Sequence, residues 1–274
     1  MGTTPPVLPK DRQSALIPRI STALRYPRGA FLSALGRREQ WRQWNEITSD
    51  RYYERLGRHR IEVDLAALGL GLEHGLDFVV EELRREVLSG SSNPTAVQPT
   101  IDAITSQKAA FVPILFHIVR RLRPKVVVET GVDTGRSAVA ILAAMNANGL
   151  GDLYSVDVLP STEVGGLIPG YLKMRWHFRS GHASNLLNDL FATVGPVGIF
   201  FHDSLHTKAN MLKEFRAAHS ANVPTILADN VEFGNAFRQF FGSLDDWAFR
   251  EIRYHYRQIL GLAIRGGTAY AHPN

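Results

Sequence analysis

From residue 101 onward, short apolar runs alternate with longer amphipathic segments. The short runs are rich in Val, Ile and Phe and predict strands, whereas the longer segments predict helices. This alternation predicts an α/β fold, a doubly wound and mostly parallel seven-stranded sheet whose last two strands form a pair. The predicted strands are 126–128, 152–157, 175–179, 197–203, 224–230, 247–255 and 260–265. The predicted helices are 101–122, 136 to about 149, 182–194, 207–219 and 233–241.

The first 90 residues follow a different pattern and predict a basic helical N-terminal extension, followed by a domain from 91 to 274. Residues 1–12 contain three prolines and predict disorder, and residues 13–60 predict helices interrupted at Pro18 and Pro27. Residues 61–89 place apolar side chains at mixed spacing, which favours helices that cover the core. The run SGSSNPT at 89–95 predicts a linker at the boundary.

The net positive charge of the chain comes from residues 1–60, because the remaining residues carry a net charge of −2. The formal net charge is +5, and residues 1–60 alone carry 12 Lys or Arg against 5 Asp or Glu. Five arginines and no acid lie between Gln13 and Arg38. We interpret this as a solvated helical face, while peripheral membrane contact or nucleic-acid contact by residues 13–60 stays open as an alternative.

Composition narrows the chemistry further. The chain has no cysteine, which excludes disulfides, zinc–thiolate sites and thiol nucleophiles. No apolar run is long enough to predict a transmembrane helix, and the polar start predicts no secretory signal. These features favour a cytoplasmic protein. They leave the oligomeric state open, including a homo-oligomer.

The stretch KVVVETGVDTG at 125–135 carries the clearest ligand signal. A buried strand ends at Glu129 and Thr130, a loop runs from Gly131 to Gly135, and a helix follows. Glycine lets the backbone approach a ligand closely, and a helix start offers free N–H groups. The G-x-x-x-G spacing differs from the dinucleotide and phosphate-loop motifs. An acid at the strand end favours a ligand with an ammonium group, such as S-adenosylmethionine.

Acids also end the other predicted strands, where open α/β sheets bind ligands. Asp157 ends the next strand and could accept both ribose hydroxyls of an adenosine. Asp203 ends FFHDSLH, and Asp229 with Asn230 ends ILADN. If these two strands are neighbours, the three oxygen donors favour a hard divalent cation such as Mg²⁺. Helix capping is the alternative for these aspartates.

His206, three residues after Asp203, is the candidate general base, because neutral imidazole is available near pH 7. The pair His202 and His206 has H-x-x-x-H spacing, but a strand and loop do not place both on one helical face. We therefore do not predict zinc binding there.

In this order, VVETGVDTGRSA, LYSVD, FFHDSLH and ILADNV resemble class I S-adenosylmethionine-dependent methyltransferases, over about residues 100–242. The closer resemblance is to metal-dependent O-methyltransferases of the catechol type and to bacterial enzymes that methylate sugars of macrolides and aminocoumarins. It implies a Rossmann-like fold and a site near adenine within SGHAS at 180–184. Catechol-type enzymes have lysine where this chain has His206, which favours a sugar, polyol or other natural-product hydroxyl. The cofactor residues implied are Glu129, Thr130, Gly131, Gly135, Ser137, Asp157, Gly181, His182 and Asp203; the metal ligands are Asp203, Asp229 and Asn230.

The sequence thus predicts an O-methyltransferase that acts on a small-molecule hydroxyl, with S-adenosylmethionine as methyl donor and with Mg²⁺ chemistry at Asp203 and His206. A metal-independent methyltransferase is the first alternative. A nucleic-acid-binding or nucleic-acid-modifying protein is the second, although HDSLH stands where base N-methylases carry N-P-P-[YF]. A catalytically silent fold used for assembly is the third.

Overall fold

The computed structural model describes residues 58–106, 109–255 and 258–266. The predicted disorder of residues 1–12 lies outside the described residues, as does nearly all of the predicted basic segment 13–60. In the described parts of the chain, no helix is long and apolar enough to cross a membrane.

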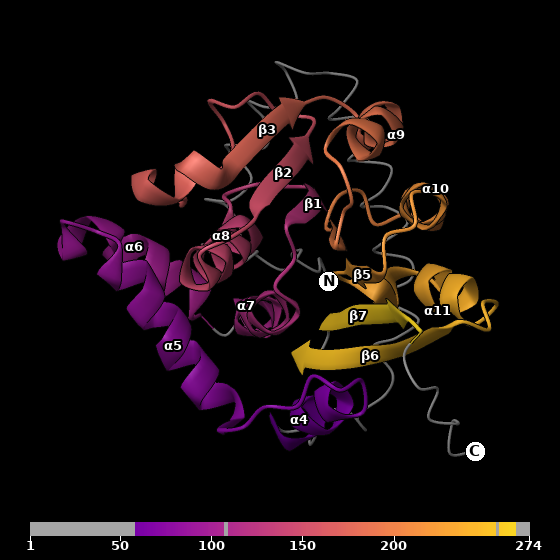
Figure 1. Cartoon of the computed structure of the whole chain (residues 1–274), viewed down its shortest axis with the longest axis horizontal. Coiled ribbons are helices and arrows are strands. Elements are labelled where there is room, and N and C mark those ends of the chain that lie inside the picture. Colours follow the sequence, from indigo (N-terminus) through magenta and orange to yellow (C-terminus); the bar gives the residue numbers. More distant parts are fainter. Residues whose placement is uncertain (1–57, 107–108, 256–257, 267–274) are drawn as a thin grey trace, which may run out of the picture.

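The predicted seven-stranded α/β sheet is confirmed (Figure 1). Its strand order is β3-β2-β1-β4-β5-β7-β6. The first five strands are parallel, and β7 runs antiparallel to both β5 and β6, as the predicted terminal pair requires. The strands are β1 Val126–Thr130, β2 Asp152–Asp157, β3 Trp176–Ser180, β4 Ile199–His202, β5 Thr225–Ala228, β6 Trp247–His255 and β7 Gln258–Arg265.

Helices cover both faces of this sheet. Before β1 lie α4 Arg58–Ala66, α5 Gly75–Ser89, α6 Pro94–Ile104 and α7 Phe111–Leu122. Between strands lie α8 Arg136–Asn148, η3 Gly170–Arg175, α9 Ala183–Thr193, α10 Lys208–Ser220, η4 Val231–Phe233 and α11 Ala236–Phe241. The predicted cap of α8 is confirmed, because Gly149 follows it in the left-handed region with φ +69°.

Two predicted helices are wrong in extent. The single helix predicted over 101–122 is two helices, α6 and α7, separated at Thr105–Ala110. Pro113 lies in the first turn of α7, where its missing N–H costs least, and a helix continuing from α6 would place it in the interior. The helix predicted over 233–241 is likewise divided into η4 and α11, with Gly234 between them.

The alternating side chains of the strands build one core on each face. Helices α4 to α8 pack with Val127, Ile199 and Leu227 on one face. Helices α9 to α11 pack with Val128 and Phe200 on the other. In Figure 1, α4, α5 and α6 lie on the opposite side of the sheet from α9, α10 and α11. The helices α5 and α6 therefore share one core although the predicted domain boundary falls between them, and the boundary stays a prediction.

The strand order also fixes where a ligand site can form. The chain leaves β1 towards β2 on one side, and later returns to place β4 on its other side. This reversal at β1 is the switch point at which open α/β sheets bind ligands. Residues that follow β1, β4 and β5 therefore meet at one edge of the sheet.

Leu83→Ala tests whether α5 belongs to the folded body. Leu83 is fully buried in the same core as Val127, so we expect a loss of about 2–5 kcal/mol in the free energy of unfolding. Val63→Ala is the matched control, because Val63 is half exposed and should change stability by about 0.5 kcal/mol or less. Urea denaturation of the full chain measures both. Equal stability of the two variants would show that α5 is not part of the cooperative unit.

Candidate active site

The glycine loop after β1 lies directly against the segment after β4. Gly131 has φ +83° and donates its N–H to the Val156 carbonyl at 2.8 Å. A Cβ at Gly131 would lie 2.1 Å from the backbone oxygen of Asp203. Only glycine fits at this contact, which joins the predicted cofactor loop to the predicted metal and base segment.

A second loop packs on the glycine loop from the β2 side. The N–H groups of Gly165 and Leu167 donate to the carbonyls of Asp133 and Thr134, both at 2.9 Å. Gly135 then starts α8 in the left-handed region, with φ +95°, and the Gly165 backbone lies within 3.0 Å of where its Cβ would be. The segment between β2 and η3 thus closes one side of the glycine loop.

Glu129 is a buried carboxylate with one free oxygen. Its side chain has no exposed surface, and Oε2 accepts a hydrogen bond from the Ser155 hydroxyl at 2.8 Å. Ser137 at the start of α8 also hydrogen-bonds the carboxylate, whereas Oε1 is buried without a hydrogen-bond partner. Burial raises the pKa of Glu129 to about 7. A cationic donor at Oε1 would satisfy both the charge and the free oxygen.

Asp157 holds the glycine loop. Its Oδ2 accepts from the backbone N–H groups of Val132 at 2.7 Å and Asp133 at 3.2 Å, and Oδ1 accepts from Leu159 at 3.0 Å. These bonds place the carboxylate beside the cofactor loop, where a ribose would use its remaining lone pairs. The ribose contact stays a prediction, and the structure adds a loop-fixing role that the sequence did not indicate.

Three other predicted cofactor residues take different positions. The Thr130 hydroxyl points away from Glu129, to the opposite face of the sheet, and donates to Glu214 of α10 at 2.7 Å. Gly181 donates its N–H to the Asp157 carbonyl at 2.7 Å, while His182 is exposed at the start of α9. Of these three, Thr130 has its side chain committed to another partner.

Asp203 and Asp229 follow neighbouring strands, which is the condition under which they were predicted to lie close together. β4 and β5 are neighbours, and Asp229 donates its backbone N–H to the His202 carbonyl at 2.9 Å. Burial, and next the charge of Asp229, raises the pKa of Asp203 well above its ordinary value. Burial likewise raises the pKa of Asp229 to about 6. Two carboxylates that each resist ionisation form a site that a cation would stabilise.

Asp229 is fixed by neutral donors on both of its oxygens. The Tyr254 hydroxyl of β6 donates to Oδ1 at 2.6 Å, and the Asn230 amide donates to Oδ2 at 2.8 Å. Asn230 adopts a left-handed backbone conformation, with φ +53°. Its amide nitrogen faces Asp229, so its carbonyl oxygen is the atom left to meet a cation.

His206 lies beside Asp203. Its Nε2 is 3.5 Å from Asp203 Oδ1, is buried and has no hydrogen-bond partner, whereas the ring contacts the Asp229 backbone carbonyl. Burial, and next the nearby His202, lowers the pKa of His206 to about 3. The imidazole is therefore neutral, with Nε2 facing the carboxylate. A hydroxyl proton or a cation between these two acceptors would join them.

The oxygen atoms of Asp203, Asp229 and Asn230 are suitable ligands for a hard cation. Two carboxylates and an amide oxygen are ligands that Mg²⁺ accepts, and among the described residues no lysine or arginine forms an ion pair with Asp203 or Asp229. Within the same residues, no group of three or more His, Cys, Asp or Glu has the arrangement of a metal site. The proposed ligand set therefore depends on Asn230 as its third member.

The sequence analysis missed two residues that hold the site, Tyr254 and Glu214. Tyr254 gave no usable signal, because an aromatic residue in a strand is usually part of the core. Glu214 did give a signal, because it lies between Met211 and Phe215 on the buried face of α10. A buried acid at such a position needs hydrogen-bond or charged partners. A groove between α9 and α10 also includes Glu214 in its lining, but it is on the helix side and not at the strand ends.

Residues 128–228 match the family model described as "Methyltransferase domain". Over these residues, which make up less than half of the chain, the protein is similar to that family. The matched span begins in β1 and ends with β5, so it contains the glycine loop and Asp203 and stops just before Asp229. The predicted resemblance to class I S-adenosylmethionine-dependent methyltransferases is confirmed at the level of domain and fold.

Solved structures show the same fold. Cofactor-bound Rv0187 from MTB is 19% identical over 69% of this chain and 97% of its own, with a TM-score of 0.51. Two further solved structures are similar with TM-scores below 0.5. The O-methyltransferase from Bacillus cereus in complex with SAH is 14% identical over 75% of this chain and 97% of its own (TM-score 0.46). TomG from Streptomyces achromogenes, an O-methyltransferase involved in tomaymycin synthesis, is 15% identical over 77% and 100% (TM-score 0.47).

No curated protein sequence matches this chain.

Gly131→Ala tests the backbone contact that joins the two halves of the site. The added Cβ would meet the Asp203 backbone and requires a left-handed alanine, so we expect a loss of stability above about 2 kcal/mol. Gly149→Ala is the matched control, because φ is +69° there but no atom lies within 4 Å of the new Cβ. Urea denaturation compares the two. Equal losses would mean that the contact at Asp203 relaxes freely.

Proposed function

We propose that the protein transfers the methyl group of S-adenosylmethionine to a hydroxyl oxygen of a small molecule, such as a sugar or natural product, with a hard divalent cation at Asp203, Asp229 and Asn230. The observation that carries the proposal is the pair of adjoining sites at the switch point. The first site presents the buried carboxylate of Glu129, one oxygen of which has no hydrogen-bond partner, beside a glycine loop. The other presents two carboxylates and a neutral histidine.

The cofactor assignment is supported by the chemistry of Glu129 and its surroundings. S-adenosylmethionine supplies an electrophilic methyl group on sulfur and carries an ammonium group. The ammonium would donate to Glu129 Oε1, the buried oxygen without a partner. Gly131 leaves space at the end of β1, and the start of α8 adds backbone N–H groups. Ser155 and Ser137 hold the other side of the carboxylate and orient it.

The cation assignment is supported by the desolvated carboxylates of the second site. A cation bound there would lower the pKa of an acceptor hydroxyl and orient it. Asp203 and Asp229 would provide charge, and Asn230 a neutral oxygen. Tyr254 fixes Asp229 through Oδ1, which restricts the carboxylate to one orientation.

The proton of the acceptor hydroxyl would pass to Nε2 of His206. The ring is neutral and its Nε2 is free, so it can accept. A base with such a low pKa holds a proton weakly, and the adjacent Asp203 carboxylate would stabilise the imidazolium at 3.5 Å. The segment 203–206 would therefore orient the hydroxyl and remove its proton, while the contact at Gly131 sets the approach to the methyl donor.

A metal-independent methyltransferase is the second candidate. It is favoured by the neutral donors Tyr254 and Asn230, which already satisfy both oxygens of Asp229. In that case His206 and Asp203 would together act as the general base, without a cation. Nucleic-acid contact, which the sequence does not lead us to expect, and membrane contact by residues 13–60 both stay alternatives, because that segment lies largely outside the described residues.

The pH dependence of cofactor binding tests the role of Glu129. Binding of an ammonium group favours the ionised carboxylate, so below pH 7 the protein must release a proton when S-adenosylhomocysteine binds. Affinity should therefore rise with pH by up to about tenfold per unit below pH 7 and level off above it. Calorimetry in buffers of different ionisation enthalpy measures the proton release.

Glu129→Gln is the control for this experiment, because Asp229 and Glu232 also have raised pKa values, of about 6 and about 8. The variant should bind more weakly and release no proton at Glu129. If the wild type and Glu129→Gln release the same number of protons, Glu129 is not the ammonium acceptor.

Substitutions at the second site should have graded effects on turnover. Asp203→Ala or Asp229→Ala should abolish most methyl transfer to a panel of sugars and natural-product hydroxyl compounds, and a chelator should have the same effect on the wild type. His206→Ala should lower kcat by about 10²–10⁴-fold with Mn²⁺ binding retained. Asn230→Ala should be milder than either aspartate variant, because a neutral ligand is lost.

Asp189→Asn is the control for charge alone, since Asp189 is an exposed acid of α9 that pairs with Arg179. It should keep wild-type turnover. Full activity in the presence of chelator, with Asp203→Ala also active, would instead support the metal-independent candidate.

A further inference from the structure

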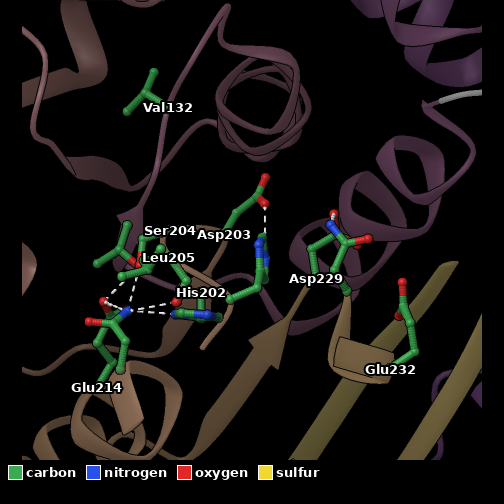
Figure 2. Close-up of polar contacts among 12 residues, drawn as sticks. Val132, His202, Asp203, Ser204, Leu205, Glu214, Asp229 and Glu232 are labelled. Carbon is green, nitrogen blue, oxygen red and sulfur yellow. Dashed lines mark hydrogen bonds and ion pairs between the residues drawn. The ribbon is translucent and has the colours of Figure 1, made fainter. Parts of the chain in front are cut away.

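Glu214 of α10 lies at the centre of a buried polar network behind the proposed site. Only 1% of its surface is exposed, and its carboxylate receives four side-chain hydrogen bonds. Oε2 accepts from the Thr130 hydroxyl and from His202 Nδ1, both at 2.7 Å. Oε1 accepts from the Ser204 hydroxyl at 2.7 Å and the Asn210 amide at 2.8 Å. Figure 2 shows these bonds converging on Glu214.

The donors come from both halves of the site. Thr130 is the last residue of β1, between Glu129 and Gly131, and His202 is the last residue of β4, before Asp203. The two are paired across the parallel strands, so their side chains point to the same face. One carboxylate oxygen therefore joins the strand end of the cofactor site to the strand end of the metal and base site.

The same carboxylate holds the segment between Asp203 and Thr207. At the ends of this segment, the Asp203 N–H donates to the Thr130 carbonyl at 2.8 Å, and the Thr207 N–H donates to the Leu205 carbonyl at 2.9 Å. The positions between them are held by side chains. Asn210 donates its amide to the Ser204 hydroxyl at 3.1 Å and to the Leu205 carbonyl at 3.0 Å, and Glu214 fixes both Asn210 and Ser204.

A third contact reaches His206 itself. Glu214 orients the ring of His202, whose other nitrogen is buried without a hydrogen-bond partner. The His202 ring meets the His206 ring edge to face, with centroids 5.4 Å apart. Any rotation of His202 would displace His206, because both rings are buried in close contact.

We propose that Glu214 is a positioning residue that sets the placement of Asp203 and His206 relative to the cofactor loop. The inference rests on the proposed function, since it assigns Glu214 to the geometry of that site. All four partners of Glu214 can donate, and a carboxylate is the side chain that accepts from all four at once. Burial opposes ionisation of Glu214, but His202 and the hydrogen bonds outweigh it and lower its pKa, so the group is a carboxylate.

Glu214→Gln is the diagnostic variant, because it keeps the size of the side chain and places an NH₂ group against donors. We expect Mn²⁺ affinity to fall by about 10–100-fold, which is the usual effect of losing a residue that orients metal ligands. Affinity for S-adenosylhomocysteine should change less, by about threefold at most, because Glu129 is held by Ser155 and Ser137. Hydrogen exchange of residues 203–207 should accelerate.

Asn148→Ala is the matched control for a buried polar residue. Asn148 is buried on the other face of the sheet, where its amide donates to the Val119 carbonyl at 3.2 Å. It should lower stability and leave both affinities and the exchange of 203–207 unchanged. If Glu214→Gln lowers stability in the same way, with wild-type Mn²⁺ affinity and exchange, Glu214 is only structural and the proposal fails.

Two provisions keep the test decisive. If Glu214→Gln does not fold, Asn210→Ala removes the amide that donates to Ser204 and Leu205 and leaves Glu214 in place. Mn²⁺ affinity should then fall and exchange of residues 203–207 should accelerate, both by less than in Glu214→Gln. Unchanged Mn²⁺ affinity and exchange would overturn the proposal. If the wild type binds neither S-adenosylhomocysteine nor Mn²⁺, the proposed function fails. The exchange of residues 203–207 then still reports separately whether Glu214 holds that segment.

Discussion

The structure depends on buried carboxylates gathered at one edge of the sheet. Glu129, Asp203 and Asp229 follow or end three neighbouring parallel strands, and burial raises the pKa of each. Isolated charge in such a place is costly, and neutral donors such as Ser155 and Tyr254 offset only part of that cost. The arrangement is stabilised when positive charge arrives. The proposed cationic cofactor and divalent cation would meet this requirement.

The two faces of the sheet have different roles in the proposed site. Glu129 points to the side of α8, where the glycine loop begins, whereas the next residue, Thr130, points to the side of α10. Because strand side chains alternate, one strand end supplies both a ligand contact and an anchor for it. Glu214 uses that alternation at β1 and β4 together. Under the proposed function, the methyl donor and the acceptor would thereby be held by one rigid group of residues and not by separate loops.

The sequence predicted the sheet and its acidic edge because strand runs and the residues after them are local signals. It predicted that Asp203 and Asp229 would meet only if their strands were neighbours, and the strand order supplies that condition. It did not predict that the Thr130 side chain faces α10, because this depends on which helix packs on each face of the sheet. The break between α6 and α7 was missed although the polar run TSQK at 105–108 and Pro113 both mark it in the sequence. The backbone bonds of Asp157 could not be predicted from residue types at all.

The central claim is that positive charge occupies this acidic edge from two directions. Diffraction from crystals of the full chain grown with S-adenosylhomocysteine and Mn²⁺ tests it most directly. The account predicts the ligand's ammonium group on Glu129 and an anomalous manganese peak among Asp203, Asp229 and Asn230. An ordered ligand whose ammonium group lies away from Glu129, with no anomalous peak at the aspartates, would contradict it.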